Sequence, residues 1–362
     1  MNTIWNDLPR PFFVLAPMEA VTDVVFRHVV AQAGAPDVWF TEFTNATGWA
    51  HAGDKAIGGR LIKTDDEKPI IAQLWGSDPA SMEKLAKHCA ELGYDGIDIN
   101  MGCPDQSAIK SGGGSGMILN PENAAAIIAA AKTSGLPVSV KTRLGYSRVD
   151  EWHDWISHVL RQDIVNFTIH LRTKKEMSKV PAHFELIPDI KKLRDDLAPH
   201  TLLTINGDIL DRAHGLELVE KYGVDGVMIG RGIFANPFAF VADTTKRVAR
   251  ESEQQEGIVS DSSPLLNHSV RTRETATLRD DSEGISNDAS GATQIIKKRL
   301  NLLRLQLDLY DQYANQTGRP FETLKRFFKI YVRDFADASE LRDKLMHAKS
   351  TDEVRDLLDT LQ

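Results

Sequence analysis

The chain has 362 residues, of which 42% are hydrophobic and 26% charged, and a formal net charge of −8, values typical of a globular protein with one large and one smaller domain. No apolar run approaches the ~18 residues of a membrane span and the N-terminus lacks a signal-peptide pattern, so we expect a cytoplasmic protein with no membrane partner. Two cysteines are too few for a disulfide framework or a structural zinc site, and the acidic charge argues against nucleic acid as a partner unless a local basic face exists.

Eight short apolar segments alternate with helical patterns along most of the chain. Their starts lie roughly 24–42 residues apart, which leaves room for one helix and two loops between successive strands. The alternation therefore predicts eight parallel strands, each followed by a helix. The segments are 12–18, 38–43, 70–76, 96–102, 138–145, 166–173, 202–208 and 226–232.

Local signals mark where the intervening helices begin and end. Asn120 followed by Pro121 and Glu122 is a typical helix start, because asparagine caps free N–H groups and proline suits the first turn, and Asn236-Pro237 repeats this pattern. Glycine often ends a helix, because it adopts the left-handed conformation without strain. The glycines at such positions are Gly34, Gly93, Gly135 and Gly223.

The order of the elements predicts an α/β fold, a (β/α)8 TIM barrel over residues 1–246. An open doubly wound sheet is the alternative, but that fold usually has fewer strands and often a glycine-rich turn after the first one. Here the first strand ends in Ala16-Pro17-Met18. We therefore favour the barrel.

The chain changes character after the barrel. Residues 247–293 are polar and acidic, with four bases against nine acids between 248 and 293, and we expect a disordered insert or linker. Residues 294–362 regain the helical period. They predict a C-terminal all-α helical domain.

Polar side chains recur at the carboxyl ends of the predicted strands. Because side chains alternate along a strand, the apolar residues of 96–102 face the helices while Asp98 and Asn100 face the interior. The same alternation turns Arg143 and Arg172 inward. One buried polar layer has no functional meaning by itself, but active sites of such barrels lie at this end. Five strands carry an inward polar residue at similar depth, namely Gln73, Asn100, Lys141, His170 and Asn206.

The last two strands end in the glycine-containing loops Asn206-Gly207-Asp208 and Gly230-Arg231-Gly232. Glycine lets backbone N–H groups approach an anion, and an arginine can pair with it. Loops after strands seven and eight often bind phosphate in these barrels. Together the loops predict a phosphate site, although Arg231 alone could be an ordinary surface arginine.

The two cysteines lie in different settings. Cys89 belongs to a helical pattern and is expected to be buried as a small apolar side chain. Cys103 follows the fourth strand, between Gly102 and Pro104, at the rim of the predicted active site. A thiol there could act as a nucleophile activated by His170, or as an acid that donates a proton to carbon.

The strands and their exits carry the segments LAPMEAVTD, TEF, AQLWGSDP, GYDGIDINMGCP, VSVKTRLGY, TIHLRT, TINGDI and VDGVMIGRGIFANP. In that order and spacing, over residues 10–240, they resemble the bacterial tRNA-dihydrouridine synthases. The segments FETLKRFFKIYV and ASELRDKLMHA resemble that family's C-terminal helical domain. The resemblance implies a barrel with tightly but non-covalently bound FMN that reduces the C5–C6 double bond of uridines in tRNA, with NADPH supplying the electrons.

The resemblance also implies roles for individual residues. Cys103 would protonate C5 of the uracil while C6 receives a hydride, and Asn100 would contact that base. Gln73 would hydrogen-bond the flavin ring, and Lys141 would lie near its N1–C2 edge, where a cation stabilises the reduced anion. His170 would contact the cofactor. The other residues that would hold the cofactor are Pro17, Met18, Asn206, Gly207, Asp208, Gly230 and Arg231.

A basic segment of the C-terminal domain is the predicted tRNA-binding surface. Between residues 297 and 333 nine bases stand against three acids, a local charge of +6. Such charges contact phosphates, although a solvated helix face without a partner is the simpler alternative. The candidate residues are Lys325, Arg326 and Lys329, followed by Arg143 and Arg172 of the barrel.

The sequence is also compatible with two other functions. One is a flavin barrel that acts on a free pyrimidine, as dihydroorotate dehydrogenases do, and this would not need a basic helical tail. The other is a non-catalytic tRNA-binding protein with the same fold, which would be expected to lack Cys103 or the cofactor residues. We expect a monomer without a bound metal.

Overall fold

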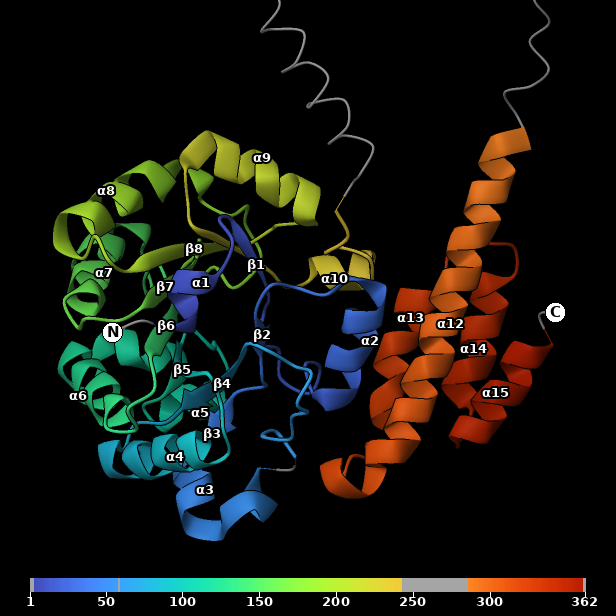
Figure 1. The fold of residues 1–362 in the computed structure, drawn as a ribbon, viewed down its shortest axis with the longest axis horizontal. Helices are drawn as coiled ribbons and strands as arrows, with labels where there is room; N and C mark the ends of the chain where they lie inside the picture. Colours follow the sequence, from blue (N-terminus) through green and yellow to red (C-terminus); the bar gives the residue numbers. More distant parts are fainter. Residues whose placement is uncertain (1–2, 58, 243–285, 361–362) are drawn as a thin grey trace, which may run out of the picture.

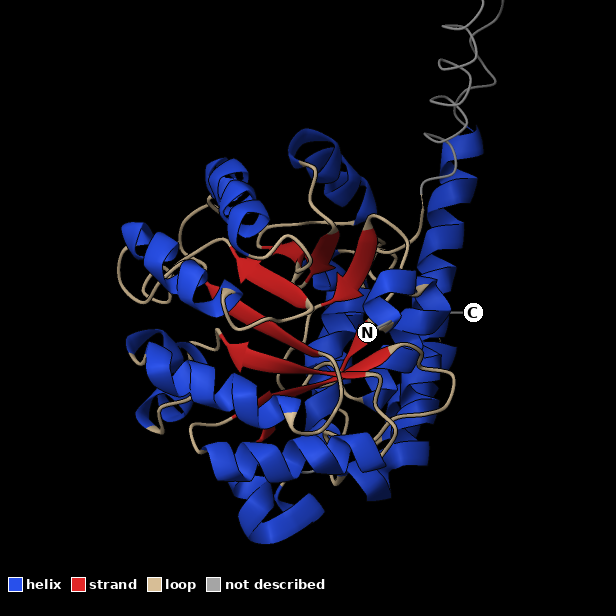
Figure 2. Ribbon diagram, turned by 60° about the vertical axis from the view of Figure 1, so that its left-hand side comes forward, coloured by secondary structure: helices blue, strands red, loops and turns tan. Residues whose placement is uncertain are grey.

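Parallel strands form a barrel that helices surround (Figures 1 and 2). The structure, a computed structural model, describes residues 3–57, 59–242 and 286–360. The strands are β1 (Phe12–Leu15), β2 (Trp39–Phe40), β3 (Thr44–Asn45), β4 (Ile70–Trp75), β5 (Gly96–Met101), β6 (Val138–Arg143), β7 (Asn166–His170), β8 (Leu202–Asn206) and β9 (Gly226–Ile229). Hydrogen-bonded neighbours follow the order β1-β9-β8-β7-β6-β5-β4-β2, and a parallel bridge between Val14 and Val38 joins the two ends. The predicted TIM barrel is confirmed.

The segment 38–43 differs from the continuous strand that the sequence predicted. Its first part forms the two-residue strand β2, and β3 pairs separately with β4. Between them the hydroxyl of Thr41 accepts the N–H of Gln73 (3.0 Å), in place of a backbone carbonyl. Glu42 follows, and its carboxylate bonds to groups outside the sheet. A side chain thus fills one pairing position of the interrupted strand, while the N–H of Thr41 still donates to the carbonyl of Ile71 (3.0 Å).

Helices follow the strands and cover the outside of the barrel (Figure 2). They are α1 (Ile4–Asp7), α2 (Val24–Gly34), α3 (Ala46–Ala52), α4 (Pro79–Glu91), α5 (Gln106–Lys110), α6 (Pro121–Lys132), α7 (Trp152–Leu160), α8 (Ile187–Leu197), α9 (Arg212–Tyr222) and α10 (Gly232–Ala235). Asn120 caps α6 as predicted, and Gly223 ends α9 in the left-handed conformation (φ 65°). Asn236-Pro237 starts no helix in the described residues. Instead Asn236 ends α10, and its Oδ1 accepts the N–H of Phe238 in a turn.

The barrel interior is apolar at the amino ends of the strands. Trp5 of α1 packs edge-on against Phe12, with ring centroids 5.8 Å apart. Phe40, Ile71 and Met228 belong to the same buried cluster. This layer closes the amino end of the barrel, so the inward polar side chains collect at the carboxyl end.

The C-terminal helices are α12 (Ser286–Thr317), the 3₁₀ helix η5 (Phe321–Phe327), α13 (Phe328–Tyr331), α14 (Ala338–His347) and α15 (Thr351–Asp359). Residues 286–293, predicted as the end of the linker, are part of α12. A nucleated helix extends at little cost where no proline interrupts it, and none occurs between 286 and 317. The rest of the predicted linker, residues 247–285, lies outside the described residues.

The helical domain packs against one side of the barrel, next to α2 (Figure 1). The ring of Phe26 in α2 contacts those of Phe234 and Phe327, with centroid distances of 6.5 and 5.0 Å. Such aromatic contacts bury large apolar areas. A hydrogen bond from Arg326 Nη1 to the carbonyl of Ala20 (3.1 Å) places the helical domain beside the first loop of the barrel, residues 16–23.

Candidate active site

A cavity of about 620 Å³ opens at the carboxyl ends of the strands. Its volume lies within the range of small-molecule sites, roughly 300–1,000 Å³. The structure brings together here most of the residues that the sequence singled out. Those that line the cavity are Pro17, Met18, Asn100, Cys103, Lys141, Arg143, His170, Asn206, Gly207, Asp208, Gly230 and Arg231.

A chain of hydrogen bonds runs through the strands beneath the cavity. Ser139 Oγ donates to Asp98 Oδ1 (2.6 Å), and Gln73 Nε2 donates to Asp98 Oδ2 (2.7 Å). Gln73 Oε1 in turn accepts from Asn100 Nδ2 (2.9 Å). Each link fixes the next amide, because an amide that donates on one side must present its oxygen on the other. The chain therefore sets the orientation of the Asn100 side chain in the cavity wall.

The oriented Asn100 side chain in turn positions the backbone of Cys103. Its Oδ1 accepts the backbone N–H groups of Gly102 (3.1 Å) and Cys103 (2.9 Å). The carbonyl of Cys103 accepts the N–H of Ser115 (2.9 Å). At Gly114 (φ +54°) a Cβ would lie 2.8 Å from that carbonyl, so the close approach requires glycine. Residues 111–116 had no predicted role, although their run of glycines was an available signal in the sequence.

The surroundings of Cys103 keep its thiol protonated. It is partly exposed and lines the cavity, whereas Cys89 is fully buried as predicted. Burial raises the pKa of the Cys103 thiol above its ordinary value, and a backbone hydrogen bond from Asp105 and the charge of Arg143 oppose this rise without cancelling it. At neutral pH the side chain is the neutral thiol, which suits an acid better than a nucleophile.

Burial also shifts the pKa values of two charged groups on the cavity floor. It lowers the pKa of Lys141 to about 8, and the neighbouring charge of Arg143 adds to this. It raises the pKa of Asp98 to about 6, against the hydrogen bonds from Ser139 and Gln73. Lys141 therefore carries a charge at neutral pH that is only partly solvated. Such a cation attracts an anionic or strongly polar ligand.

His170 is a neutral imidazole. Burial and then the charges of Arg143, Lys141 and Arg172 hold its pKa well below the ordinary value. Arg172 Nη1 lies 3.3 Å from His170 Nε2, and since arginine can only donate, Nε2 is an acceptor. A neutral His170 is available as a hydrogen-bonding and stacking surface.

Asp208 organises the far end of the cavity. Its Oδ2 accepts from Arg172 and from Ala182 N–H (3.0 Å), and its Oδ1 lies 3.2 Å from Arg231 Nη2. Burial would raise the pKa of Asp208, but these hydrogen bonds and charges lower it below its ordinary value. Arg172, a candidate substrate contact on the sequence, is only 2% exposed and also donates to the carbonyl of Val180 (2.6 Å). Its guanidinium thus holds the loop rather than facing the cavity opening.

The residues present fit a flat polar ring system that carries an anion. Lys141 supplies a cation at one end, where His170, whose Nε2 is taken by Arg172, supplies its Nδ1–H as a donor. Arg231, with a side chain 63% exposed, supplies a cation at the other end. Backbone can approach closely at Gly207 (φ +122°), where a Cβ would lie 3.2 Å from His170 Cδ2. A flavin nucleotide has these features. Gln73 lies just beneath the lining, bonded to Asn100.

The basic segment of the helical domain is only partly available to a partner. Lys325 is half-buried with its Nζ 5.6 Å from the Phe321 ring centroid, whereas Arg326 and Lys329 are exposed. Arg326 Nη1 also donates to the carbonyl of Ala20 (3.1 Å). The bases of residues 297–333 that pair with acids are Arg299, Arg304, Arg319 and Arg333. The local surplus of charge that the sequence indicated is therefore smaller at the surface.

The described residues contain neither a membrane-spanning helix nor a cluster of metal-binding side chains. No helix within them has both the length and the apolar character needed to cross a bilayer. In the same ranges no three or more His, Cys, Asp or Glu side chains lie together in a way that could hold a metal ion.

Comparison with known proteins identifies relatives over the whole chain. A family model described as dihydrouridine synthase (Dus) matches residues 14–312. The chain is 54% identical over its full length to "Probable tRNA-dihydrouridine synthase 2" of Bacillus subtilis (strain 168), of which it covers 97%. It is 52% identical to a "Probable tRNA-dihydrouridine synthase" of Staphylococcus epidermidis and 51% to that of Staphylococcus aureus (strain MRSA252), covering 97% and 96% of them.

A likeness to solved structures is much weaker. A complex of 2-naphthoyl-CoA reductase aligns with a TM-score of 0.47 and 11% identity, over 66% of this chain and 50% of that one. This level of similarity supports no conclusion about function. The family match and the full-length relatives are sufficient by themselves, and they show that this chain belongs to the dihydrouridine synthase family.

Proposed function

We propose that this protein reduces the C5–C6 double bond of uridine in tRNA to 5,6-dihydrouridine, with FMN as its cofactor and NADPH as the source of electrons. The observation that carries the proposal is the placement of the Cys103 thiol. It faces the cavity that Lys141, His170 and Arg231 line, and it is held there by Asn100. Membership of the family supports the same reaction.

FMN held by these residues would supply the hydride for C6 of the uracil. Cys103 donates the proton of its Sγ to C5, so that one hydride and one proton together saturate the double bond. The thiolate that remains is stabilised by the charge of Arg143 and recovers a proton from water. A thiol with a raised pKa is a stable proton carrier at neutral pH.

The other residues bind and orient. Lys141 provides positive charge where the reduced cofactor would carry negative charge. Asn100 has one N–H bonded to Gln73, which leaves the second N–H for the uracil. Arg231 and the backbone of Gly207 and Gly230 would hold the phosphate end. We also expect the protein to act as a monomer in the cytoplasm, and Lys325, Arg326 and Lys329 to contact tRNA phosphates.

One experiment tests the proposal. The purified protein is examined for the visible spectrum of a flavin and then incubated with NADPH and tRNA from a strain without dihydrouridine synthases. Mass spectrometry of the digested tRNA should show dihydrouridine at defined positions. Reduction of orotate, uracil or uridine monophosphate without any change in tRNA would favour the free-pyrimidine alternative. A protein that binds tRNA but neither flavin nor NADPH would be non-catalytic.

A further inference from the structure

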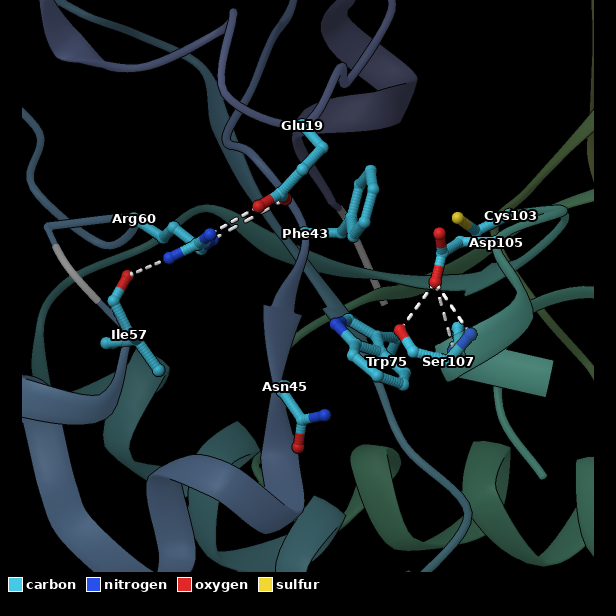
Figure 3. A pocket seen from close by; sticks show the side chains of 10 residues that line it. Glu19, Phe43, Asn45, Ile57, Arg60, Trp75, Cys103, Asp105 and Ser107 are labelled. Carbon is cyan, nitrogen blue, oxygen red and sulfur yellow. Dashed lines mark hydrogen bonds and ion pairs between the residues drawn. The ribbon is translucent and has the colours of Figure 1, made fainter. Parts of the chain in front are cut away.

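A second hollow, of about 440 Å³, adjoins the cofactor cavity (Figure 3). The two share the lining residues Glu19, Phe43 and Cys103. Trp75 and Asp105 line only the second hollow. The Cys103 thiol therefore lies at the boundary between the cofactor cavity and the second hollow. A group bound in the second hollow would lie next to the uracil on which that thiol acts. None of the roles proposed above uses this space.

Two aromatic rings give the second hollow its walls. Trp75, the last residue of β4, is half-buried, and a Cβ at Gly113 would lie only 2.8 Å from its Cε3, so the glycine run holds the indole in place. Phe43 lies in the loop between β2 and β3 and is also half-buried. Figure 3 shows both rings between the Glu19–Arg60 pair and Asp105. Flat apolar faces of this kind stack on nucleobases.

The charges in the second hollow disfavour a phosphate. Arg60 is already neutralised by Glu19, and its Nη1 donates to the carbonyl of Ile57 (2.6 Å). Asp105 caps α5 through Oδ1, which accepts from Ser107 N–H (2.8 Å), and its Oδ2 remains as an acceptor. With two carboxylates against one arginine, the hollow suits an uncharged group that donates hydrogen bonds. An exocyclic amino group of a base is such a donor.

We propose that the second hollow binds the base of the nucleotide next to the target uridine in the same RNA strand. The base would stack on Trp75 and Phe43, and bases with an amino group would bind better than uracil. This inference rests on the proposed function. A uridine placed against Cys103 has its chain neighbours close by, and enzymes that extract a base commonly read the flanking nucleotides as well. The hollow would then help to select which uridine is reduced.

The test uses the tRNA that yields dihydrouridine in the experiment above. Three versions are compared, one unaltered and two with an abasic ribose directly 5′ or 3′ of the target. With wild-type protein, removing one of the two bases should raise KM about tenfold, because stacking of one base is worth a factor of that order or more, while kcat changes less. Among the four bases at that position, uracil should give the highest KM.

Variants of Trp75 connect this effect to the hollow. Trp75→Leu should raise KM for the unaltered tRNA and lose the difference between it and the abasic form, whereas Trp75→Phe should keep most of that difference. Trp152→Leu, which removes a half-buried tryptophan of α7, is the matched control and should retain it. Thermal unfolding of all variants checks that each is folded.

Several results would overturn the inference. Wild-type protein could treat both abasic tRNAs like the unaltered one, or Trp75→Leu could still discriminate between them. A higher KM for NADPH in Trp75→Leu with unchanged RNA discrimination would assign the hollow to the dinucleotide. Failure of wild-type protein to make any dihydrouridine would overturn the proposed function itself, and this inference with it.

Discussion

Arg319 and Glu42 form a buried ion pair that joins the helical domain to the barrel. The Glu42 side chain is fully buried, and that of Arg319 is 12% exposed. Arg319 Nη1 also lies 3.2 Å from Asp23 Oδ2, and Glu42 Oε1 accepts the N–H of Ala20 (2.5 Å). Burial raises the pKa of Glu42, and Arg319 opposes that shift. The pair thus connects the loop after α12 with the loop that carries Pro17 and Met18 into the active site.

Replacing Arg319 by alanine should destabilise the protein in a pH-dependent way. Loss of one partner of a buried pair costs about 3 kcal/mol when the other stays charged. Without Arg319, Glu42 can become neutral by binding a proton. A carboxyl whose folded pKa is raised above its unfolded pKa contributes stability below the unfolded pKa. That contribution is lost as the pH rises through the folded pKa. The pKa of Glu42 rises further without Arg319, so urea unfolding should show a smaller loss at pH 5 than at pH 8. Equal losses at both values would contradict this account.

A matched control is available in the same domain. Arg304 pairs with Asp359 at the surface (2.8 Å), with side chains 33% and 63% exposed. Exposed pairs contribute about 0–1 kcal/mol. Arg304→Ala should therefore cost little, and its cost should vary much less between pH 5 and pH 8.

Replacing Cys103 by alanine should abolish most of the formation of dihydrouridine and spare the steps before it. A general acid typically contributes ~10²–10⁴-fold to the rate. Flavin content and reduction by NADPH should stay close to wild type, because the thiol acts only on the uracil. The measurement is single-turnover dihydrouridine formation beside stopped-flow flavin reduction. Cys89→Ala removes the other, buried thiol and should leave the rate near wild type. A Cys103→Ala rate within threefold of wild type would place the acid elsewhere.

The affinity for FMN should depend on pH through Lys141. Because burial lowers the pKa of Lys141 to about 8, its charge is present below that pH and lost above it. The dissociation constant, followed by flavin fluorescence, should therefore rise as the pH increases from 7 to 9. Riboflavin should show the same trend, which separates Lys141 from the phosphate end. Lys141→Met should bind more weakly at pH 7 and lack this pH dependence, and an unchanged profile in that variant would refute the role of the lysine.

The half-buried Lys325 and the exposed Lys329 of the helical domain should contribute to tRNA binding in a salt-dependent way. Lys325→Gln with Lys329→Gln removes two charges, whereas Arg326 is left in place because it also bonds to Ala20. Each phosphate contact contributes about 0.7–0.9 to the slope of log K against log salt, so the slope should flatten by about 1–2. Affinity is measured at several salt concentrations.

The control for this prediction removes the same number of charges. Arg299 and Arg304 are paired with Asp334 and Asp359, each at 2.8 Å. Glutamine at both positions should leave the salt slope nearly unchanged. If the two double variants behave alike, the RNA surface lies on the barrel, and Arg143, which lines the cavity, becomes the next candidate.

The amino-acid sequence by itself determined the barrel and the inner face of strands such as β5. Alternation in 96–102 was enough to turn Asp98 and Asn100 inward, and the interval between apolar segments predicted parallel strands joined by helices. These features follow from local rules, since the strand period of two and the length of a crossover depend only on neighbouring residues. For the same reason Cys103 could be assigned to the rim from its position after the strand.

Only the tertiary structure decided what each polar group does once the strands are assembled. Arg143 and Arg172 have the same inward pattern, yet Arg143 lines the cavity while Arg172 is taken up by Asp208. In the sequence Arg319 belongs to a basic segment, but in the structure it forms an ion pair with Glu42, 277 residues away in the chain. The second hollow likewise combines loops around Glu19, Phe43, Trp75 and Asp105. Charge pairing and cavity shape depend on approach within a few ångströms between distant segments, and no local pattern encodes that distance.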